Sequence, residues 1–264
     1  MPDPSANQAL GLLGLTGAMG PQLTAMVSHG DDKSELPLLW QLSSSLVDLG
    51  YTVTVLDGTQ SEAEDNPGLL QLLEYRFGVG ALEPDGPGWN IVPAAQGIQQ
   101  LAALGSTLRP LQRLGDFFAA GSIVILYTGV DALVRLLSGS TVRPLLTVST
   151  DKNALVTSYL ALKRLLLRGG LEPTLLNMMQ ASGSRSAMAP GTVATNLSEC
   201  ARNFLGYELS TLTVMASLDA PEVRTQMRRL CMRLLENALP LERPSLALSA
   251  TAHRANAGLI SRSH

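Results

Sequence analysis

The sequence predicts an α/β fold, a mostly parallel central sheet of about seven strands with helices on both faces. Short apolar runs rich in β-branched residues alternate with segments of helical periodicity, which is typical of this architecture. Gly and Pro gather between these segments, at 61–68, 78–88 and 182–191, where we expect loops. The expected strands are 23–28, 51–57, 90–93, 123–127, 145–149, 171–177 and 209–214.

Apolar residues recur at helical spacing in two segments that each follow an expected strand. Each stripe would place one face of a helix against the sheet. The first stripe is Leu38, Leu39, Leu42 and Leu46, and the second is Leu155, Tyr159, Leu162 and Leu166.

Length and composition indicate one globular domain. The chain has 264 residues, 45% of them hydrophobic and 16% charged. We expect an N-terminal extension at 1–20, the α/β domain at 21–240 and a poorly ordered tail at 241–264. The net charge of −3 gives no general attraction to nucleic acid.

Several features predict a cytoplasmic protein. The two cysteines have neither zinc-site nor disulfide-framework spacing, and no apolar run reaches the ~18 to 20 residues that span a bilayer. The first residues lack the basic start and apolar core of a signal peptide. The three histidines are too scattered to form a metal or catalytic set. We therefore expect no catalytic residue and no metal site.

A strand, a short loop ending in Lys-Ser, a helix and a strand ending in Asp57 follow one another near the N-terminus. The loop reads VSHGDDKS at 27–34. This order resembles the start of a MinD/ParA-family ATPase, which has a deviant P-loop. The likeness continues at 89–97, 149–163, 175–177 and 200–206, and so covers roughly residues 20–225.

The resemblance implies a nucleotide site that takes Mg-ATP. Lys33 stands where the family has its phosphate-binding lysine, and Ser34 where it has the hydroxyl that binds Mg²⁺. Gly30 lies within the loop, Asp57 at the end of the next strand, and Asn177 at the position that commonly contacts adenine.

Five departures from the family pattern predict that ATP cleavage is impaired and that no cofactor is retained, with a relic pocket for Mg-ATP as the alternative. Asp32 replaces the glycine before the lysine, and Asp31 precedes it, so two carboxylates would face the phosphates. A like-charge pair at ~4 Å costs about 4 kcal/mol at an effective dielectric of ~20. Ser28 replaces the family's second lysine, Thr59 its second Asp after the strand, and Tyr127 the Asp that helps to hold Mg²⁺.

A purely structural role is the alternative for each of these residues. Asp31, Asp32 or Ser34 would cap the following helix, with a carboxylate in the anion position at its N-terminus. Lys33 would point to solvent or pair with Asp57. Asp57 and Asn177 would satisfy nearby backbone donors, and Tyr127 would be a packing residue.

Within the family, the sequence is most similar to the FlhG-type regulators of flagellar number. Their N-terminal Asp-Gln-Ala motif engages a signal-recognition-particle-like GTPase. Here Gln8 and Ala9 are in place, but Asn7 replaces the Asp and the closing Arg is absent. On a helix, Ala9, Leu12 and Leu13 would share a face that suits a partner groove. The alternative is that this segment folds onto the domain.

A basic amphipathic helix is expected from about Pro221 to Leu239. Its apolar stripe would lie on an anionic membrane, as in MinD-like proteins, or pack on the domain core with the arginines in solvent. The stripe is Val223, Met227, Leu230, Cys231 and Leu234, and the basic residues are Arg224, Arg228, Arg229 and Arg233.

Together these features predict a catalytically impaired MinD/ParA-like regulator that acts through protein contacts, in flagellar number or placement. The loss of the second lysine favours a monomer or a nucleotide-independent dimer. One alternative is a slow ATPase that retains Lys33, Ser34 and Asp57. Another is a nucleic-acid or membrane-surface adaptor, peripheral to the inner membrane, that uses the arginine-rich helix.

Overall fold

The computed structural model describes residues 20–75, 88–105, 109–148, 152–179, 192–215 and 221–241. The extension at 1–19, the tail from 242 onward and most of the expected loops at 78–88 and 182–191 lie outside the described residues. The expectation that the tail is poorly ordered therefore remains a prediction. The same holds for the partner motif at Gln8, Ala9, Leu12 and Leu13.

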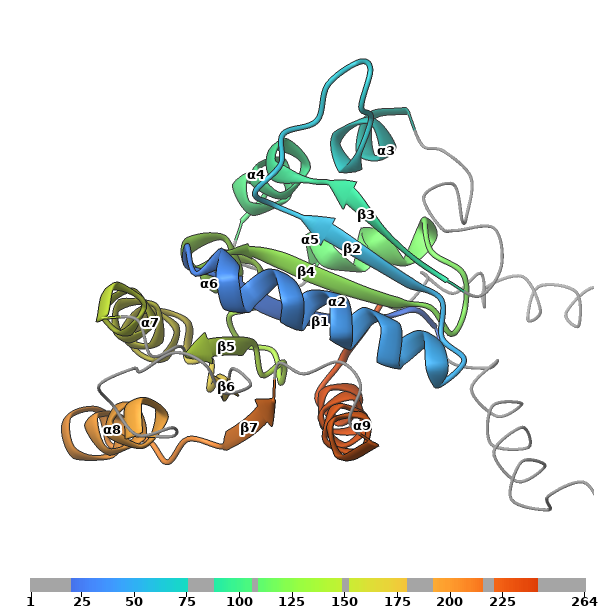
Figure 1. Cartoon of the computed structure of the whole chain (residues 1–264). Coiled ribbons are helices and arrows are strands. Elements are labelled where there is room, and N and C mark those ends of the chain that lie inside the picture. Colours follow the sequence, from blue (N-terminus) through green and yellow to red (C-terminus); the bar gives the residue numbers. More distant parts are fainter. Residues whose placement is uncertain are drawn as a thin grey trace, which may run out of the picture.

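A single sheet forms the centre of the molecule, with strand order β3-β2-β4-β1-β5-β6-β7 (Figure 1). All of these neighbours pair in parallel. The predicted parallel sheet is thus confirmed. Its strands are β1 (Gln22–Ser28), β2 (Val53–Asp57), β3 (Trp89–Pro93), β4 (Ile123–Gly129), β5 (Leu145–Val148), β6 (Thr174–Met179) and β7 (Thr211–Met215).

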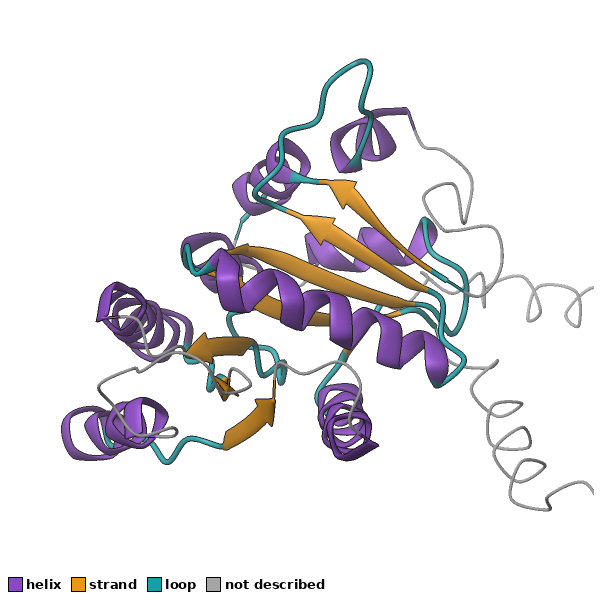
Figure 2. Ribbon diagram, in the orientation of Figure 1, coloured by secondary structure: helices purple, strands orange, loops and turns teal. Residues whose placement is uncertain are grey.

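Helices cover both faces of the sheet, as predicted (Figure 2). α2 and α9 pack on one face, and the others pack on the opposite face. Short π-helical turns extend α7 and α8 to Gly169 and Leu205. The helices are α2 (Asp32–Asp48), α3 (Leu69–Tyr75), α4 (Ala95–Ala103), α5 (Arg109–Gln112), α6 (Val130–Leu137), α7 (Lys152–Arg164), α8 (Thr192–Cys200) and α9 (Pro221–Glu236).

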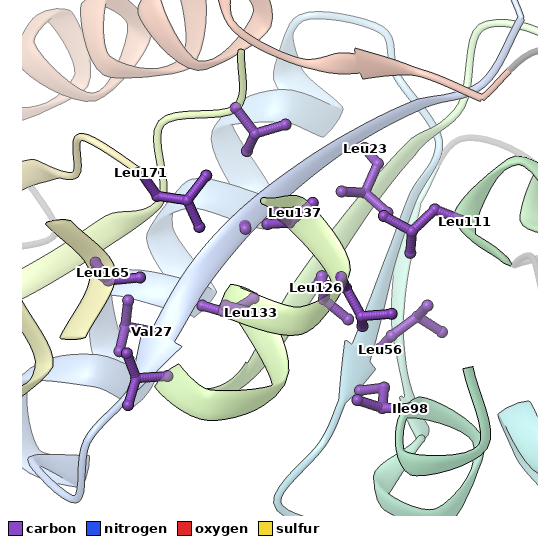
Figure 3. Packing of buried hydrophobic residues seen from close by; sticks show 14 of the residues in the cluster. Leu23, Val27, Leu56, Ile98, Leu111, Leu126, Leu133, Leu137, Leu165 and Leu171 are labelled. Carbon is purple, nitrogen blue, oxygen red and sulfur yellow. The ribbon is translucent and has the colours of Figure 1, made fainter. Parts of the chain in front are cut away.

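Each face of the sheet has its own apolar core. The expected stripe of α2 is fully buried against α9 and the sheet, together with the stripe of α9 itself. On the other face, leucines of α6 and α7 pack on β1 and β4. Figure 3 shows this packing around Val27, Leu126, Leu133 and Leu165. Burial of each such side chain contributes about 1.5 to 3 kcal/mol.

Several boundaries differ from the prediction, most of them by one or two residues. β6 starts at Thr174 rather than at 171, because the turn after α7 closes only at Gly170, whose φ is +60°. Leu241, the first residue of the predicted tail, is buried, and its N–H donates to the carbonyl of Pro21 at 2.8 Å. The short strand β8 (Leu239–Pro240), which was not predicted, pairs antiparallel with β1.

The connections leave the sheet in opposite directions at its centre. β1 leads into α2 on one face, whereas its neighbour β4 leads into α6 on the other. In open parallel sheets, such a switch in direction opens a crevice beyond the carboxyl ends of the strands. The loop at 28–31 lies at this edge.

Candidate functional site

The carboxylate of Glu35, in the first turn of α2, lies inside the loop that links β1 to α2. Its side chain is fully buried. Oε1 accepts the backbone N–H of His29 at 3.1 Å and that of Asp31 at 2.9 Å. A P-loop turns such N–H groups toward phosphate oxygens. In this chain, two of them are already bonded to an internal anion.

Tyr127, near the end of β4, binds the other oxygen of the same carboxylate. Its hydroxyl donates to Glu35 Oε2 at 2.6 Å, and its ring is buried between the sheet and α2. Burial, followed by the hydrogen bond to Glu35, raises the pKa of Tyr127 well above its ordinary value. The residue at the family's Mg²⁺-binding position therefore packs in the core and binds a carboxylate.

His29 connects this cluster to β5. Its Nε2 lies 3.0 Å from the carbonyl oxygen of Thr147 and 3.1 Å from the hydroxyl of the same residue. Its Nδ1 lies 3.4 Å from Glu35 Oε1. The loop is therefore attached to its own helix, to β4 and to β5 through buried polar contacts.

The hydroxyl of Ser34 is also engaged within the loop. It donates to the carboxylate of Asp31, and it lies 3.2 Å from the carbonyl oxygen of Asp31. Both residues are buried. The hydroxyl that the resemblance assigned to Mg²⁺ thus has an internal acceptor. Asp31 is the N-cap residue of α2, but its side chain makes no capping hydrogen bond, so the expected capping by these side chains is not found.

The remaining loop residues face outward. Lys33 and Asp32 are exposed, and among the described residues no ion pair of Lys33 is found. Gly30 has φ +90°, the left-handed region in which only glycine is unstrained, with open space around its Cα. Of the two structural alternatives for Lys33, the structure thus shows the exposed side chain and not the ion pair with Asp57.

Asp57 is satisfied locally. Its Oδ1 accepts the N–H of Thr59 at 2.8 Å and the Thr59 hydroxyl at 2.6 Å. The threonine that replaces the family's second Asp therefore binds the first one. Asp57 therefore has the structural role at the strand end that is the alternative to metal binding.

Asn177 lies on β6, three strands away from β4. It is buried, and its Nδ2 has no hydrogen-bond partner among the described residues. A buried amide without a partner is uncommon in folded proteins. Asn177 is thus the one member of the predicted nucleotide set that keeps a free buried donor within the described ranges.

A cavity of about 390 Å³ opens beside the loop, at the carboxyl ends of β1, β2 and β4. Polar groups of Ser28, His29 and Thr128 line it, together with α4, α6 and α7. It lies on the α6 side of the sheet and does not include Lys33, Ser34 or Glu35. The described part of the chain contains no group of three or more residues suited to a metal ion.

Glu35 was missed by the sequence analysis, although the pattern held a signal. It precedes Leu38, Leu39, Leu42 and Leu46 at the same helical spacing, so it belongs to the buried face of α2. A carboxylate on the buried face must find hydrogen-bond donors. The loop and Tyr127 supply them.

Glu62 was missed as well. Its buried carboxylate accepts the N–H groups of Gln96 and Gly97, each at 2.8 Å, and that of Leu70 at 3.1 Å. It thereby caps the N-termini of α3 and α4 together. A second anion position near this edge of the sheet is therefore also filled by the chain's own carboxylate.

On α9, the apolar stripe faces the core and the arginines face outward. Val223, Met227 and Leu230 are buried, as are the other two stripe residues. Arg224, Arg228, Arg229 and Arg233 are exposed. The stripe is therefore not available to a membrane. No helix in the described ranges combines the length and the apolarity of a bilayer span.

No family model matches the sequence, and neither does any curated protein. Similar folds are nevertheless found among solved structures. The cell division ATPase MinD of Pyrococcus furiosus has a TM-score of 0.54 at 14% identity, covering 81% of this chain and 99% of that one. A plasmid partition protein of Borrelia burgdorferi has a TM-score of 0.51 at 11% identity, with coverage of 81% and 99%.

A third similar structure is cobyrinic acid a,c-diamide synthase of Mycobacterium smegmatis with bound ADP and magnesium. Its TM-score is 0.51 at 13% identity, covering 82% of this chain and 94% of that one. At these identities the likeness concerns the fold. The chain has the MinD/ParA-type P-loop NTPase fold.

Proposed function

We propose that this protein is a MinD/ParA-like regulator that acts through protein contacts and does not cycle ATP. The observation that carries the proposal is the position of Glu35. Its buried carboxylate accepts two N–H groups of the loop after β1. A phosphate bound in the same loop would have to displace the Glu35 carboxylate or lie beside it, where the two like charges would repel each other.

The residues around the loop do not fit Mg-ATP in this arrangement. The Ser34 hydroxyl is bonded to Asp31, and Tyr127 brings a neutral phenol where the family has a carboxylate. Asp57 is bonded to Thr59. The synthase with a similar fold has ADP and magnesium bound, but here the side chains of Ser34, Tyr127 and Asp57 already have internal partners.

A rigid loop favours contact with other proteins over catalysis. The network joins β1, β4, β5 and α2 through the chain's own side chains. We therefore expect the same surface to be presented whether or not nucleotide is available. Among the described residues, exposed Lys33, Leu36 and Trp40 on α2 belong to that surface. Exposed apolar residues that lie close together commonly mark protein interfaces.

The pathway is proposed from the sequence resemblance alone. Gln8, Ala9, Leu12 and Leu13 would engage a signal-recognition-particle-like flagellar GTPase, and thereby act on flagellar number or placement. The purified GTPase from the same organism is the probe. We expect it to bind equally well with ATP, with ADP and without nucleotide, and to lose affinity for a Leu12→Ser/Leu13→Ser variant. Absence of binding would remove the flagellar assignment.

Asn177 favours a second candidate, a slow ATPase. Its buried Nδ2 without a described partner would suit a nucleotide base, and Lys33 is free to move. Phosphate release from Mg-ATP separates the two candidates. We expect wild type to match Lys33→Ala and the protein-free blank. Release that Lys33→Ala abolishes would support the ATPase and overturn our first proposal.

A further inference from the structure

A second cavity lies at the opposite edge of the sheet from the loop, at the amino ends of β1 and β4. Its volume is about 260 Å³, and its walls are mostly apolar. Tyr51 and Ile123 line it from the sheet side, and Met232 and Leu235 from the last turns of α9. Gly20, the first described residue, forms part of the wall.

Met232 is the unusual residue of this cavity. Its side chain is 51% exposed on a helix whose outward face is otherwise polar and rich in arginine. An exposed methionine beside an apolar cavity is a typical contact for another apolar segment, because its flexible side chain adapts to different partners. We therefore looked for an apolar segment that could occupy the cavity and contact Met232.

The chain itself contains an apolar segment close to the cavity in sequence. Residues 10–15 read LGLLGL and lie only five to ten positions before Gly20, which is in the cavity wall. Five extended residues span roughly 17 Å. The leucines are therefore tethered within reach, and a tethered segment binds at a high effective concentration.

Charge distinguishes this segment from the other chain end. Residues 4–28 contain no charged side chain, whereas the chain beyond Leu241 continues with Glu242 and Arg243. Leu241 also leaves the domain near Gly20, since its N–H donates to Pro21. Glu236 lies on the cavity wall and would repel Glu242. The uncharged leucine segment is the better match.

We propose that residues 10–15 dock into this cavity of their own domain, with a leucine side chain against Tyr51, Ile123 and Met232. The proposal is independent of nucleotide binding. It goes beyond the partner role proposed for Leu12 and Leu13. A partner would have to compete with the cavity in order to bind these leucines. The cavity would thus regulate access to the N-terminal segment.

Site-specific photo-cross-linking of the full chain tests this docking. A benzophenone amino acid replaces Met232, and a control protein carries it at Val156, which is 58% exposed on α7 at the other face. We expect the first protein to cross-link to residues 9–15 within one molecule, and the control to give no such product. Leu12→Ser/Leu13→Ser should lower the yield at least about fivefold.

Three results would overturn the proposal. They are cross-links from position 232 to the chain beyond 241, cross-links to a second molecule, and the absence of any cross-link to residues 1–19. An unchanged yield in the double serine variant would count equally against it. Circular dichroism of each protein checks that the domain is folded, so that a missing cross-link cannot be attributed to unfolding.

Discussion

The hydroxyl of Tyr127 and the carboxylate of Glu35 form a buried hydrogen bond of 2.6 Å between residues 92 positions apart in the sequence. It joins the end of β4 to the first turn of α2, on the face of the sheet where α9 also packs. The same carboxylate accepts two backbone N–H groups of the loop after β1. One acidic residue therefore fixes the conformation of the whole loop.

Removing only the hydroxyl should destabilise the domain. Tyr127→Phe keeps the buried ring but leaves Glu35 Oε2 without this donor. We expect the free energy of unfolding to fall by about 1 to 3 kcal/mol. Urea unfolding measures it. Tyr51→Phe is the control, because the Tyr51 hydroxyl has no such bond among the described residues, and it should change stability by less than about 0.5 kcal/mol.

Alkaline pH should weaken the fold through Tyr127. Its pKa is raised in the folded state, mainly by burial and then by the bond to Glu35. Above pH ~10 the unfolded tyrosine loses its proton while the folded one keeps it, so stability falls as pH rises. Urea unfolding at several pH values should show a steeper fall for wild type than for Tyr127→Phe, by up to about 1.4 kcal/mol per pH unit. Parallel curves would disprove this role.

Glu62 should matter for stability because it caps two helices. Glu62→Ala leaves the N–H groups of Leu70, Gln96 and Gly97 without their acceptor. We expect a loss of roughly 2 to 4 kcal/mol in the free energy of unfolding. Exposed Glu64 supplies the matched control, and Glu64→Ala should have little effect. Similar losses in the two variants would mean that the caps contribute nothing.

The two cysteines should differ in reactivity. Cys231 is fully buried in α9, and burial raises its pKa to about 12, so its thiolate is scarce and inaccessible. Cys200 is partly exposed. With a thiol reagent at pH 8 we expect one fast equivalent in native protein and two after denaturation. Cys200→Ser should remove the fast one. Fast labelling of that variant would show that α9 opens readily.

The sequence was sufficient for the sheet and for the faces of the helices. Apolar, β-branched runs gave β1 and β4 within one or two residues at either end, and the leucine stripe of α2 identified its buried face. These features depend on local periodicity. β8 was missed because two residues, Leu239 and Pro240, carry no periodic signal.

The site could be predicted only in part. The sequence located the loop and the substitutions that weaken its chemistry, and it included a carboxylate at the helix N-terminus as an alternative. It considered Asp31 and Asp32 for this role, whereas Glu35 holds it. Which carboxylate holds the role depends on how the loop turns at Gly30 and on Tyr127, which contacts Glu35 from the neighbouring strand β4. Neither contact is visible in local sequence.

Thermal unfolding with and without millimolar Mg-ATP tests the central claim most directly, with ADP as a second ligand. If Glu35 occupies the anion position of the loop, wild type should melt at the same temperature in all three conditions. A ligand at ~100 times its Kd would add about 2.7 kcal/mol, a rise of roughly 5 to 10 °C for a domain of this size. A rise of that order in wild type would contradict the account.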